Sequence, residues 1–564
     1  MAKAFRVSSF WLLLWAAALS WAWLLPNHYQ PWSTFHMDAW ASAVLLSMAC
    51  ALAWGQRHQI TRLPFIGAVA IAVAAIPWVQ YTFGQLQFVG IAWVNSAYIL
   101  GFALAVLVGQ RWEQHAPGQL GDGLFAAILI ASVFSVGLQL HQWLGLDILD
   151  IWLMGSGSGR PYANVGQPNQ LATLLLWGVI ALWWFCLRGR VRPLYAAIGT
   201  LFLSWGLVLT ASRAAWLAVL LLLACVWLWS PLWPWIRARW MAVLLALCFV
   251  VQALFAPIAT QFLLLPPFED PGGIAARSSG GLRLQAWAML FDAVTKAPWW
   301  GYGWNQGNMA QLTVAEDHLP LQILFQYSHN LFLDLVLWCG IPLGMALTVS
   351  LLAWAWRRMR SVHDAGSAML FMMLLVVGNH AMLEFPLHHA YMLLPVGLVV
   401  GALESRLRVA VLPINSLPLQ WILTIACTVI LAGLVRDYIR IEAAYQVLRF
   451  ERANFKMQAP QVAPDVLLLD QMRGPIALAR LDPSPATASS YVDWMRRVAW
   501  IYPNAGTIHK LAASLAWTGH PDEAATWLRR MCTVVQPQEC SAVHAAWAAQ
   551  VAADPAIARV PWPE

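Results

Sequence analysis

Long apolar runs alternate with short basic loops along most of this sequence. The chain has 564 residues, of which 60% are hydrophobic and 10% are charged, whereas about 25% of the residues in a soluble domain are charged. An apolar run of roughly 20 residues spans the hydrocarbon core of a bilayer as a helix. The composition therefore predicts an all-α, polytopic membrane protein with about 13 transmembrane helices. They are expected near residues 9–25, 38–54, 64–80, 91–109, 123–141, 169–187, 194–210, 213–230, 240–259, 330–354, 367–385, 390–405 and 419–435.

The basic residues of the short loops set the orientation of these helices. Lysine and arginine collect in cytoplasmic loops, and here they occupy every second loop. We therefore expect a cytoplasmic N-terminus and no nucleic-acid partner, although the net charge is +7. The first run resembles a signal sequence without a small-residue cleavage site, which predicts an uncleaved anchor. The cytoplasmic basic residues are Lys3, Arg6, Arg57, Arg62, Arg111, Arg188, Arg190, Arg192, Arg237, Arg239, Arg357, Arg358, Arg360, Arg406 and Arg408.

The chain is expected to contain two domains on the basis of this topology. Residues 1–435 would form the membrane domain, including a long external loop over residues 260–329. Residues 436–564 would form an external helical domain, since residues 509–531 read as a helix, a turn and a second helix, as in a tetratricopeptide hairpin. Cys532 and Cys540 lie together in this tail, and an oxidising compartment would allow them to form a disulfide.

Arg213 is an exception to the charge pattern, because it lies on the outer side in a very short turn between two apolar runs. A cation at this depth costs a few kcal/mol unless it is paired. One interpretation is that its long side chain reaches the lipid headgroups. The other is that it binds an anion.

Four polar motifs share one topological position, at the outer ends of helices that run inward. They are the segment 167–170, Arg213, the pair His329–Asn330, and the segment 388–391. A helix N-terminus carries about half a positive charge and unpaired N–H groups. If these helix starts converge, they favour a phosphate or diphosphate, to which Arg213 and Arg283 can each offer a planar guanidinium.

A diphosphate at the outer face of a bilayer indicates a lipid-linked donor. His329 is the candidate base, since an imidazole with an ordinary pKa of about 6.5 removes a proton from a hydroxyl near neutral pH. A single histidine here is also compatible with a water-exposed position at the membrane interface. The acidic clusters of the long loop, Glu269–Asp270 and Glu316–Asp317, read as solvated charges, so we expect no metal and no cofactor.

These motifs also carry a family resemblance. The chain resembles bacterial O-oligosaccharyltransferases of the pilin-glycosylation-ligase type, within the O-antigen ligase and polymerase superfamily. The resemblance covers most of the membrane portion and extends weakly into the tail. It is carried by YANVGQPNQLATLL (Tyr162 to Leu176), LTASRAAWLA (Leu209 to Ala218), Arg283 followed by APWWGYGWNQ (Ala297 to Gln306), SHNLFLDLVLWCGIPLG (Ser328 to Gly344) and LEFPLHHAYMLLP (Leu383 to Pro395).

The resemblance implies transfer of a preassembled glycan from undecaprenyl diphosphate to Ser or Thr hydroxyls of exported proteins such as pilins, at the outer face of a bacterial inner membrane. By position, His329 matches the essential histidine, and Arg213 and Arg283 match diphosphate-binding arginines. The other expected site residues are Gln167, Asn169, Asn330, Glu384, His389 and Tyr391.

His389 departs from the family pattern, because relatives often have an aromatic residue such as tyrosine there. It either replaces a ring or adds a second titrating group. Glu384 is expected to orient Tyr391 or a histidine, or to form a structural pair.

Two other function classes are compatible with parts of the pattern. An O-antigen ligase or polymerase would use a sugar hydroxyl as its acceptor, but it would not need a protein-docking tail. A lipid-linked glycan transporter would place its polar residues near the middle of the bilayer and often show internal repeats. The polar motifs of this chain gather at one membrane face, which favours the protein O-oligosaccharyltransferase.

Overall fold

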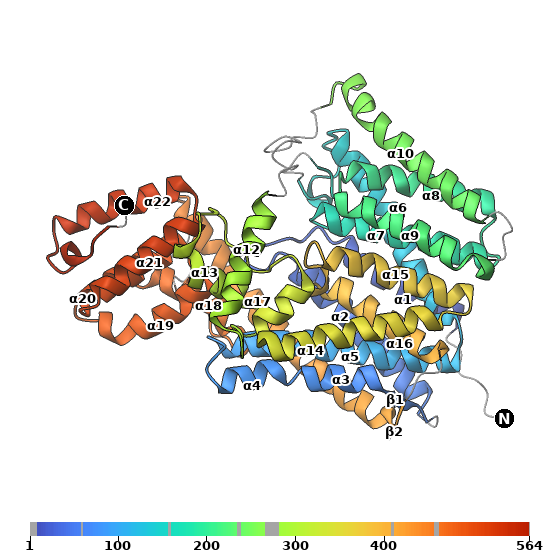
Figure 1. Ribbon diagram of the computed structural model, residues 1–564, viewed down its shortest axis with the longest axis horizontal. Helices are drawn as coiled ribbons and strands as arrows, with labels where there is room; N and C mark the ends of the chain where they lie inside the picture. Colours follow the sequence, from blue (N-terminus) through green and yellow to red (C-terminus); the bar gives the residue numbers. More distant parts are fainter. Residues whose placement is uncertain are drawn as a thin grey trace. The chain divides into compact units, whose positions relative to one another are not determined.

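The computed structural model describes the chain in seven segments (Figure 1). Internal contacts divide it into two compact units. The basic residues Lys3, Arg6, Arg237 and Arg408 and the acidic pair Glu269–Asp270 lie outside the described residues. The described segments are residues 8–57, 60–155, 160–233, 238–265, 281–407, 411–455 and 462–562. The first unit comprises residues 1–73, 97–278 and 352–431, and the second comprises residues 74–96, 279–351 and 432–564.

The first unit is a bundle of apolar helices. Helices that are apolar on every side are typical of a membrane interior. Among the 8 candidate membrane-spanning helices α7 is the most enclosed, with 78% of its 18-residue apolar stretch buried. α7 packs against α6, α8 and α15, and Figure 1 shows α6 to α10 side by side. The helices that lie wholly or partly in this unit are α1 (Ser9–Ser20), α2 (Phe35–Gly55), α3 (Phe65–Val73), α5 (Val89–His115), α6 (Gln119–Trp143), α7 (Pro168–Leu187), α8 (Pro193–Leu209), α9 (Arg213–Leu228), α10 (Ala238–Phe262), α14 (Leu331–Ser361), α15 (Ala365–Ala381), α16 (Ala390–Arg406) and α17 (Ser416–Arg452).

Every one of the expected apolar runs coincides with helix, which confirms the mostly helical, polytopic class. Among the described residues, 8 helices are long and apolar enough to cross a membrane. Four shorter apolar helices accompany them, over residues 9–23, 193–209, 213–228 and 365–381. The number of about 13 crossings stays a prediction.

A small sheet in the first unit departs from the all-α expectation. β1 (Arg62–Pro64) pairs antiparallel with β2 (Val411–Asn415). Ser416, directly after β2, donates its backbone N–H and its hydroxyl to the carbonyl of Thr61, at 2.7 and 2.9 Å. This pairing joins two loops that lie about 350 residues apart, and helical periodicity in either loop alone does not reveal it.

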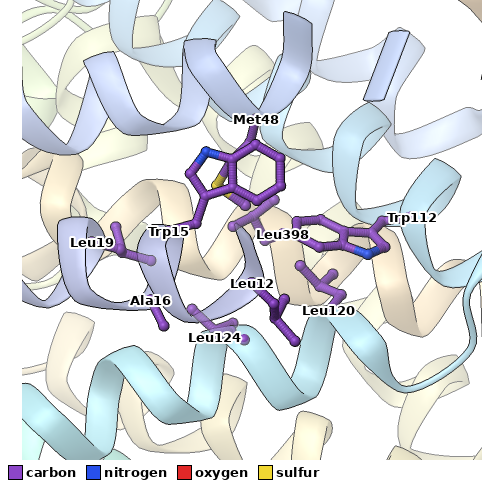
Figure 2. A pocket seen from close by; sticks show the side chains of 10 residues that line it. Leu12, Trp15, Ala16, Leu19, Met48, Trp112, Leu120, Leu124 and Leu398 are labelled. Carbon is purple, nitrogen blue, oxygen red and sulfur yellow. The ribbon is translucent and has the colours of Figure 1, made fainter. Parts of the chain in front are cut away.

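An apolar cavity of about 10 Å³ lies among α1, α2, α5, α6 and α16 of the first unit (Figure 2). Leu12, Trp15, Met48, Trp112 and Leu398 are among its lining residues. A cavity without polar partners stays dry, so this one has no hydrogen-bonding groups with which to bind a diphosphate or a sugar.

The second unit contains residues 281–329 of the expected external loop and the tail. Its helices are α4 (Ile76–Thr82), the first part of α5, α12 (Gly281–Lys296), α13 (Gly307–Val314), the first part of α14, the last part of α17, α18 (Asp470–Arg480), α19 (Ala488–Ile501), α20 (Ala505–Trp517), α21 (Pro521–Val534) and α22 (Pro537–Val551). Short 3-10 turns occur throughout the chain, at residues 21–23, 150–152, 230–232, 315–317, 386–388 and 557–559.

The last expected membrane helix, near residues 419–435, is longer than expected. It is part of α17, which runs without a break for 37 residues and continues through Arg436 into the tail. The helix–turn–helix over residues 509–531 is present as α20 and α21, and α19 packs beside α20 (Figure 1). Cys532 of α21 and Cys540 of α22 form a disulfide. The expected boundary at residue 435 and the tetratricopeptide likeness stay predictions.

α14 is kinked at Gly340, which has φ 74° and ψ 171°. Pro342 follows within the helix, where its ring prevents a regular hydrogen-bond ladder. The segment 298–303 of the family motif fills the break with three backbone hydrogen bonds: Tyr302 N–H to Leu337 O, Gly303 N–H to Trp338 O and Ile341 N–H to Pro298 O. The kink therefore fixes this motif against the helix that begins beside His329.

Candidate active site

The starts of α7 and α16 meet the end of α15 in the first unit. Gln167 precedes α7, and its side-chain oxygen accepts the N–H of Gln170 at 2.8 Å. Asn169 donates its side-chain N–H to the carboxylate of Glu384 at 3.1 Å. Two motifs about 215 residues apart in sequence are thus joined by a polar contact, as their shared topological position predicted.

Tyr391 lies at the centre of this cluster and is fully buried. Its hydroxyl donates to the side-chain oxygen of Gln170, and its ring stacks on His389 with centroids 5.3 Å apart. Thr173 and His380 add a further contact between α7 and α15, at 2.8 Å between hydroxyl and Nδ1. Burying these polar groups is tolerated because they are hydrogen-bonded to one another.

The sequence did not reveal Asp38, which holds the start of α16. This buried residue of α2 accepts the backbone N–H of Ala390 at 2.5 Å through Oδ1. Its Oδ2 accepts the hydroxyls of Thr34 and Tyr98, each at 2.9 Å. An aspartate in the first turn of an apolar helix is commonly a cap for its own helix, and nothing local points to a partner more than 350 positions away.

Thr34 links Asp38 to His389. Its hydroxyl oxygen lies 2.9 Å from Oδ2 of Asp38 and 3.2 Å from Nδ1 of His389. Nε2 of His389 is buried without a hydrogen-bond partner among the described residues.

His388 and His389 are uncharged in this environment. Burial, together with the charge of neighbouring histidines, lowers the pKa of each imidazole to about 3. Both rings are therefore neutral near pH 7. Of the two interpretations of His389, the structure favours a neutral ring over a group that titrates near physiological pH.

Arg213 begins α9, and the same end of α15 links it to the cluster. Ser212 caps α9 by accepting the N–H of Ala215 at 3.3 Å. Asn379 of α15 donates to the carbonyl of Ala214 at 3.0 Å. The Arg213 side chain is exposed. Three of the four motifs are therefore tied to α15 within one unit.

The turn before Arg213 is held by a second arginine. The guanidinium of Arg160 donates twice to the carbonyl of Thr210, at 2.9 Å through Nε and 2.6 Å through Nη2. Arg160 lies in the loop between α6 and α7, and its hydrogen bonds give it a structural part in shaping the turn before Arg213.

His329 lies in the second unit, in a left-handed backbone conformation with φ 58°. Non-glycine residues rarely adopt this conformation, and those that do often lie at functional sites. The side-chain oxygen of Asn330 accepts the N–H groups of Phe332 and Leu333 at 3.1 and 3.2 Å, which caps α14. The carboxylate of Asp334 accepts the N–H of Ser328 at 2.7 Å. Residues on both sides of His329 are thus fixed.

α12 connects Arg283 to the same region. Trp287, one turn after Arg283, donates its indole N–H to the carbonyl of Ser328 at 2.8 Å. Arg283 is exposed near the beginning of α12. The second unit therefore brings together two of the predicted site elements, the histidine and one arginine.

The helix starts are less open than expected. Gln167 caps α7, Ser212 caps α9, and Asn330 caps α14. At α16 the carboxyl group of Asp38 already accepts the N–H of Ala390. Because these caps occupy N–H groups that an anion would use, a diphosphate bound here would depend mainly on the arginines.

The acidic side chains of the external loop pair with basic residues. Glu316 binds Arg529 and Arg530 at 2.7 and 3.3 Å, and Asp317 lies 3.4 Å from Lys296. No group of three His, Cys, Asp or Glu side chains within the described segments is arranged to hold a metal ion.

The fold defines a class: a mostly helical, multi-pass membrane protein. Comparison with known proteins identifies the chemistry of that class. Residues 161–185 match the family described as a protein glycosylation ligase, residues 198–348 match O-antigen ligase, and residues 368–550 match the C-terminal part of a virulence-factor membrane-bound polymerase. No solved structure matches the chain.

Two curated relatives come from Acinetobacter baylyi (strain ATCC 33305 / BD413 / ADP1). The chain is 28% identical over 502 residues to a general O-oligosaccharyltransferase, covering 86% of each chain. It is 26% identical over 393 residues to a ComP-specific O-oligosaccharyltransferase, covering 68% of this chain and 69% of the relative. The resemblance to O-oligosaccharyltransferases and the prediction of a glycosyltransferase are therefore confirmed.

Proposed function

We propose that the chain transfers a preassembled glycan from undecaprenyl diphosphate to Ser or Thr hydroxyls of exported, pilin-like proteins. The observation that carries this proposal is the match to a general O-oligosaccharyltransferase along 86% of both chains. The match to O-antigen ligase over residues 198–348 contains His329, and the match to the membrane-bound polymerase over residues 368–550 contains Tyr391. The donor is a membrane lipid, and the acceptor is a protein.

His329 is the general base in this proposal. Its imidazole takes the proton from the acceptor hydroxyl, whose oxygen attacks the first carbon of the glycan. The bond from that carbon to the phosphate oxygen breaks, and undecaprenyl diphosphate leaves with the bonding electrons. Asp334 and Asn330 hold the backbone on either side of His329, which keeps the base in a single orientation.

Arg213 and Arg283 bind the diphosphate and stabilise the charge that grows on it as it leaves. Both side chains are exposed, so each can reach a ligand. The cluster of Gln167, Asn169, Glu384, His389 and Tyr391 supports the donor site, with the Asn169–Glu384 contact fixing the two helix starts relative to each other. The mechanism assigns no step to a metal or a cofactor.

The proposed location is the bacterial inner membrane, with the N-terminus in the cytoplasm and the domain 436–564 in the periplasm. The disulfide between Cys532 and Cys540 supports this orientation, because disulfides persist in oxidising compartments such as the periplasm.

The test is His329→Ala, with His318→Ala as the matched control. His318 lies in the same external loop and pairs with Asp292 at 3.1 Å. Mass spectrometry of exported proteins should show that the Ser- or Thr-linked oligosaccharide disappears in the first variant and persists in the second. Wild-type glycosylation by His329→Ala would remove the base from the mechanism.

A sugar hydroxyl is the second candidate acceptor, because residues 198–348 match O-antigen ligase. In cells that express the chain, glycan attached to lipopolysaccharide, with unmodified exported proteins, would favour this alternative. Glycosylated proteins would favour the first.

A further inference from the structure

The tail packs against the loop that carries His329, and the contacts all lie within the second unit. The loop (residues 318–330, hereafter the His329 loop) follows α13. Two anchors bring α13 and the tail together: Asn308 donates to the carbonyls of Trp500 and Ile501 at 3.0 and 2.7 Å, and Glu316 pairs with Arg529 and Arg530.

One turn of the tail binds the His329 loop directly. Residues 532–540 join α21 to α22 and are closed by the disulfide (hereafter the disulfide turn). The backbone N–H of Gln322 donates to the carbonyl of Thr533 at 2.9 Å. In return, the side chain of Gln536 donates to the carbonyl of Gln322 at 2.8 Å.

The contact continues from Gln322 to the histidine. Gln311 of α13 is buried and donates to the carbonyl of Ile323 at 2.8 Å. The same side chain accepts the N–H of Phe325 at 2.7 Å. The ring of Phe325 then meets the ring of His329 edge to face, with centroids 5.9 Å apart.

We propose that the disulfide turn, through Gln536 and Thr533, is a positioning element for His329. This inference rests on the proposed role of His329 as the base. The loop between Glu316 and Asn330 has no regular helix or strand to hold it, and Gln322 adopts a left-handed conformation, φ 54°, that a free loop would leave. The disulfide keeps Thr533 and Gln536 at the spacing that Gln322 needs, so the tail acts on the reaction without touching the donor.

Gln536 offers a clean test, because its side chain is exposed. Gln536→Leu removes the donor to Gln322 without opening a core. Gln538→Leu is the matched control, since Gln538 is also exposed, lies two positions later and makes no side-chain hydrogen bond to another described residue. Gln536→Lys keeps a donor at the same position. Cys532→Ser combined with Cys540→Ser opens the turn.

The first measurement is hydrogen–deuterium exchange on the full-length protein in detergent. Uptake in peptides that cover residues 318–330 should rise in Gln536→Leu and in the double serine variant, because the amides of Gln322 and Phe325 lose protection. It should match the wild type in Gln538→Leu and Gln536→Lys.

The second measurement is glycan transfer with lipid-linked oligosaccharide extracted from the host membranes. Gln536→Leu should lower kcat roughly two- to tenfold, the change expected for one net hydrogen bond, and leave the KM for the donor unchanged. Gln536→Lys should restore kcat. If Gln536→Leu matches Gln538→Leu in exchange or in kcat, the inference is overturned. A wild-type rate in His329→Ala would instead overturn the proposed function, so the two failures are distinguishable.

Discussion

Replacing Gly340 by alanine should break the packing of the external loop on α14. At φ 74° and ψ 171° the backbone occupies a region that is essentially limited to glycine. A Cβ at this position would lie 2.3 Å from the carbonyl oxygen of Trp299 and 2.7 Å from the backbone nitrogen of Trp300. Neither atom belongs to a flexible side chain that can move aside.

The size of the effect follows from two contributions. The backbone conformation costs an alanine about 1–3 kcal/mol. Moving the segment 298–303 away from the new Cβ breaks up to three backbone hydrogen bonds to α14, at about 1 kcal/mol each. The expected loss is therefore about 4–6 kcal/mol, which is comparable with the whole stability of many domains.

Thermal unfolding of the full chain in detergent measures this loss. Gly340→Ala should lower the Tm of the second unit, which has about 230 residues, by roughly 10–20 °C and reduce glycan transfer with it. The control is Gly137→Ala in α6, where a Cβ meets no atom within 4 Å, so alanine should be neutral or stabilise the helix by up to about 1 kcal/mol. Equal Tm values for the two variants would refute the account of the kink.

The remaining predictions concern the charges of the site. Asp38→Asn should destabilise the chain by about 1–3 kcal/mol, because an amide cannot accept all three hydrogen bonds that the carboxylate accepts; an unchanged Tm would contradict this. Arg213→Lys should lower transfer roughly tenfold or more, since lysine keeps the charge but lacks the planar fork, and transfer at the wild-type rate would show that charge alone suffices. His389→Phe should leave the shape of the pH–rate profile unchanged between pH 5 and 8, because the pKa of His389 is lowered to about 3 and the ring is already neutral across that range; a shifted acid limb would show that His389 titrates there. Removing divalent ions with a chelator should leave transfer unchanged, and a loss that Mg²⁺ or Mn²⁺ restores would assign a metal to the reaction.

The sequence predicted the helices closely and their partners poorly. The starts of α7, α9 and α16 lie within one residue of the expected positions, because each is marked by a polar residue or proline directly before an apolar run. Two of the marked motifs lie in contact: Asn169 donates to Glu384, and Tyr391 donates to Gln170, a pairing that was not among the expected contacts. The part of these residues in an active site stays a prediction.

Asp38 and the contact of Gln536 with Gln322 show why the rest was not predictable. Asp38 and Ala390 lie 352 positions apart, and Gln536 and Gln322 lie 214 positions apart; composition and periodicity carry no information on contacts at such distances. The boundary at residue 435 stays a prediction. α17 runs across it without a break, because Gly433 is tolerated inside the helix and no proline follows before Arg452.

The hydrogen bond between Asp38 and Ala390 at the start of α16 cannot form until long after α2 has been synthesised. At roughly 5–20 residues per second, the ribosome needs about 20–70 s to travel from residue 38 to residue 390. During that interval Asp38 of α2 lacks its hydrogen bond from the backbone N–H of Ala390. An acidic side chain without this partner is costly to place in hydrocarbon. The insertion machinery, or the neighbouring hydroxyls of Thr34 and Tyr98, must bind the side chain of Asp38 until α16 is synthesised. If translation stops early, α2 should therefore be the segment most prone to stalled insertion or degradation.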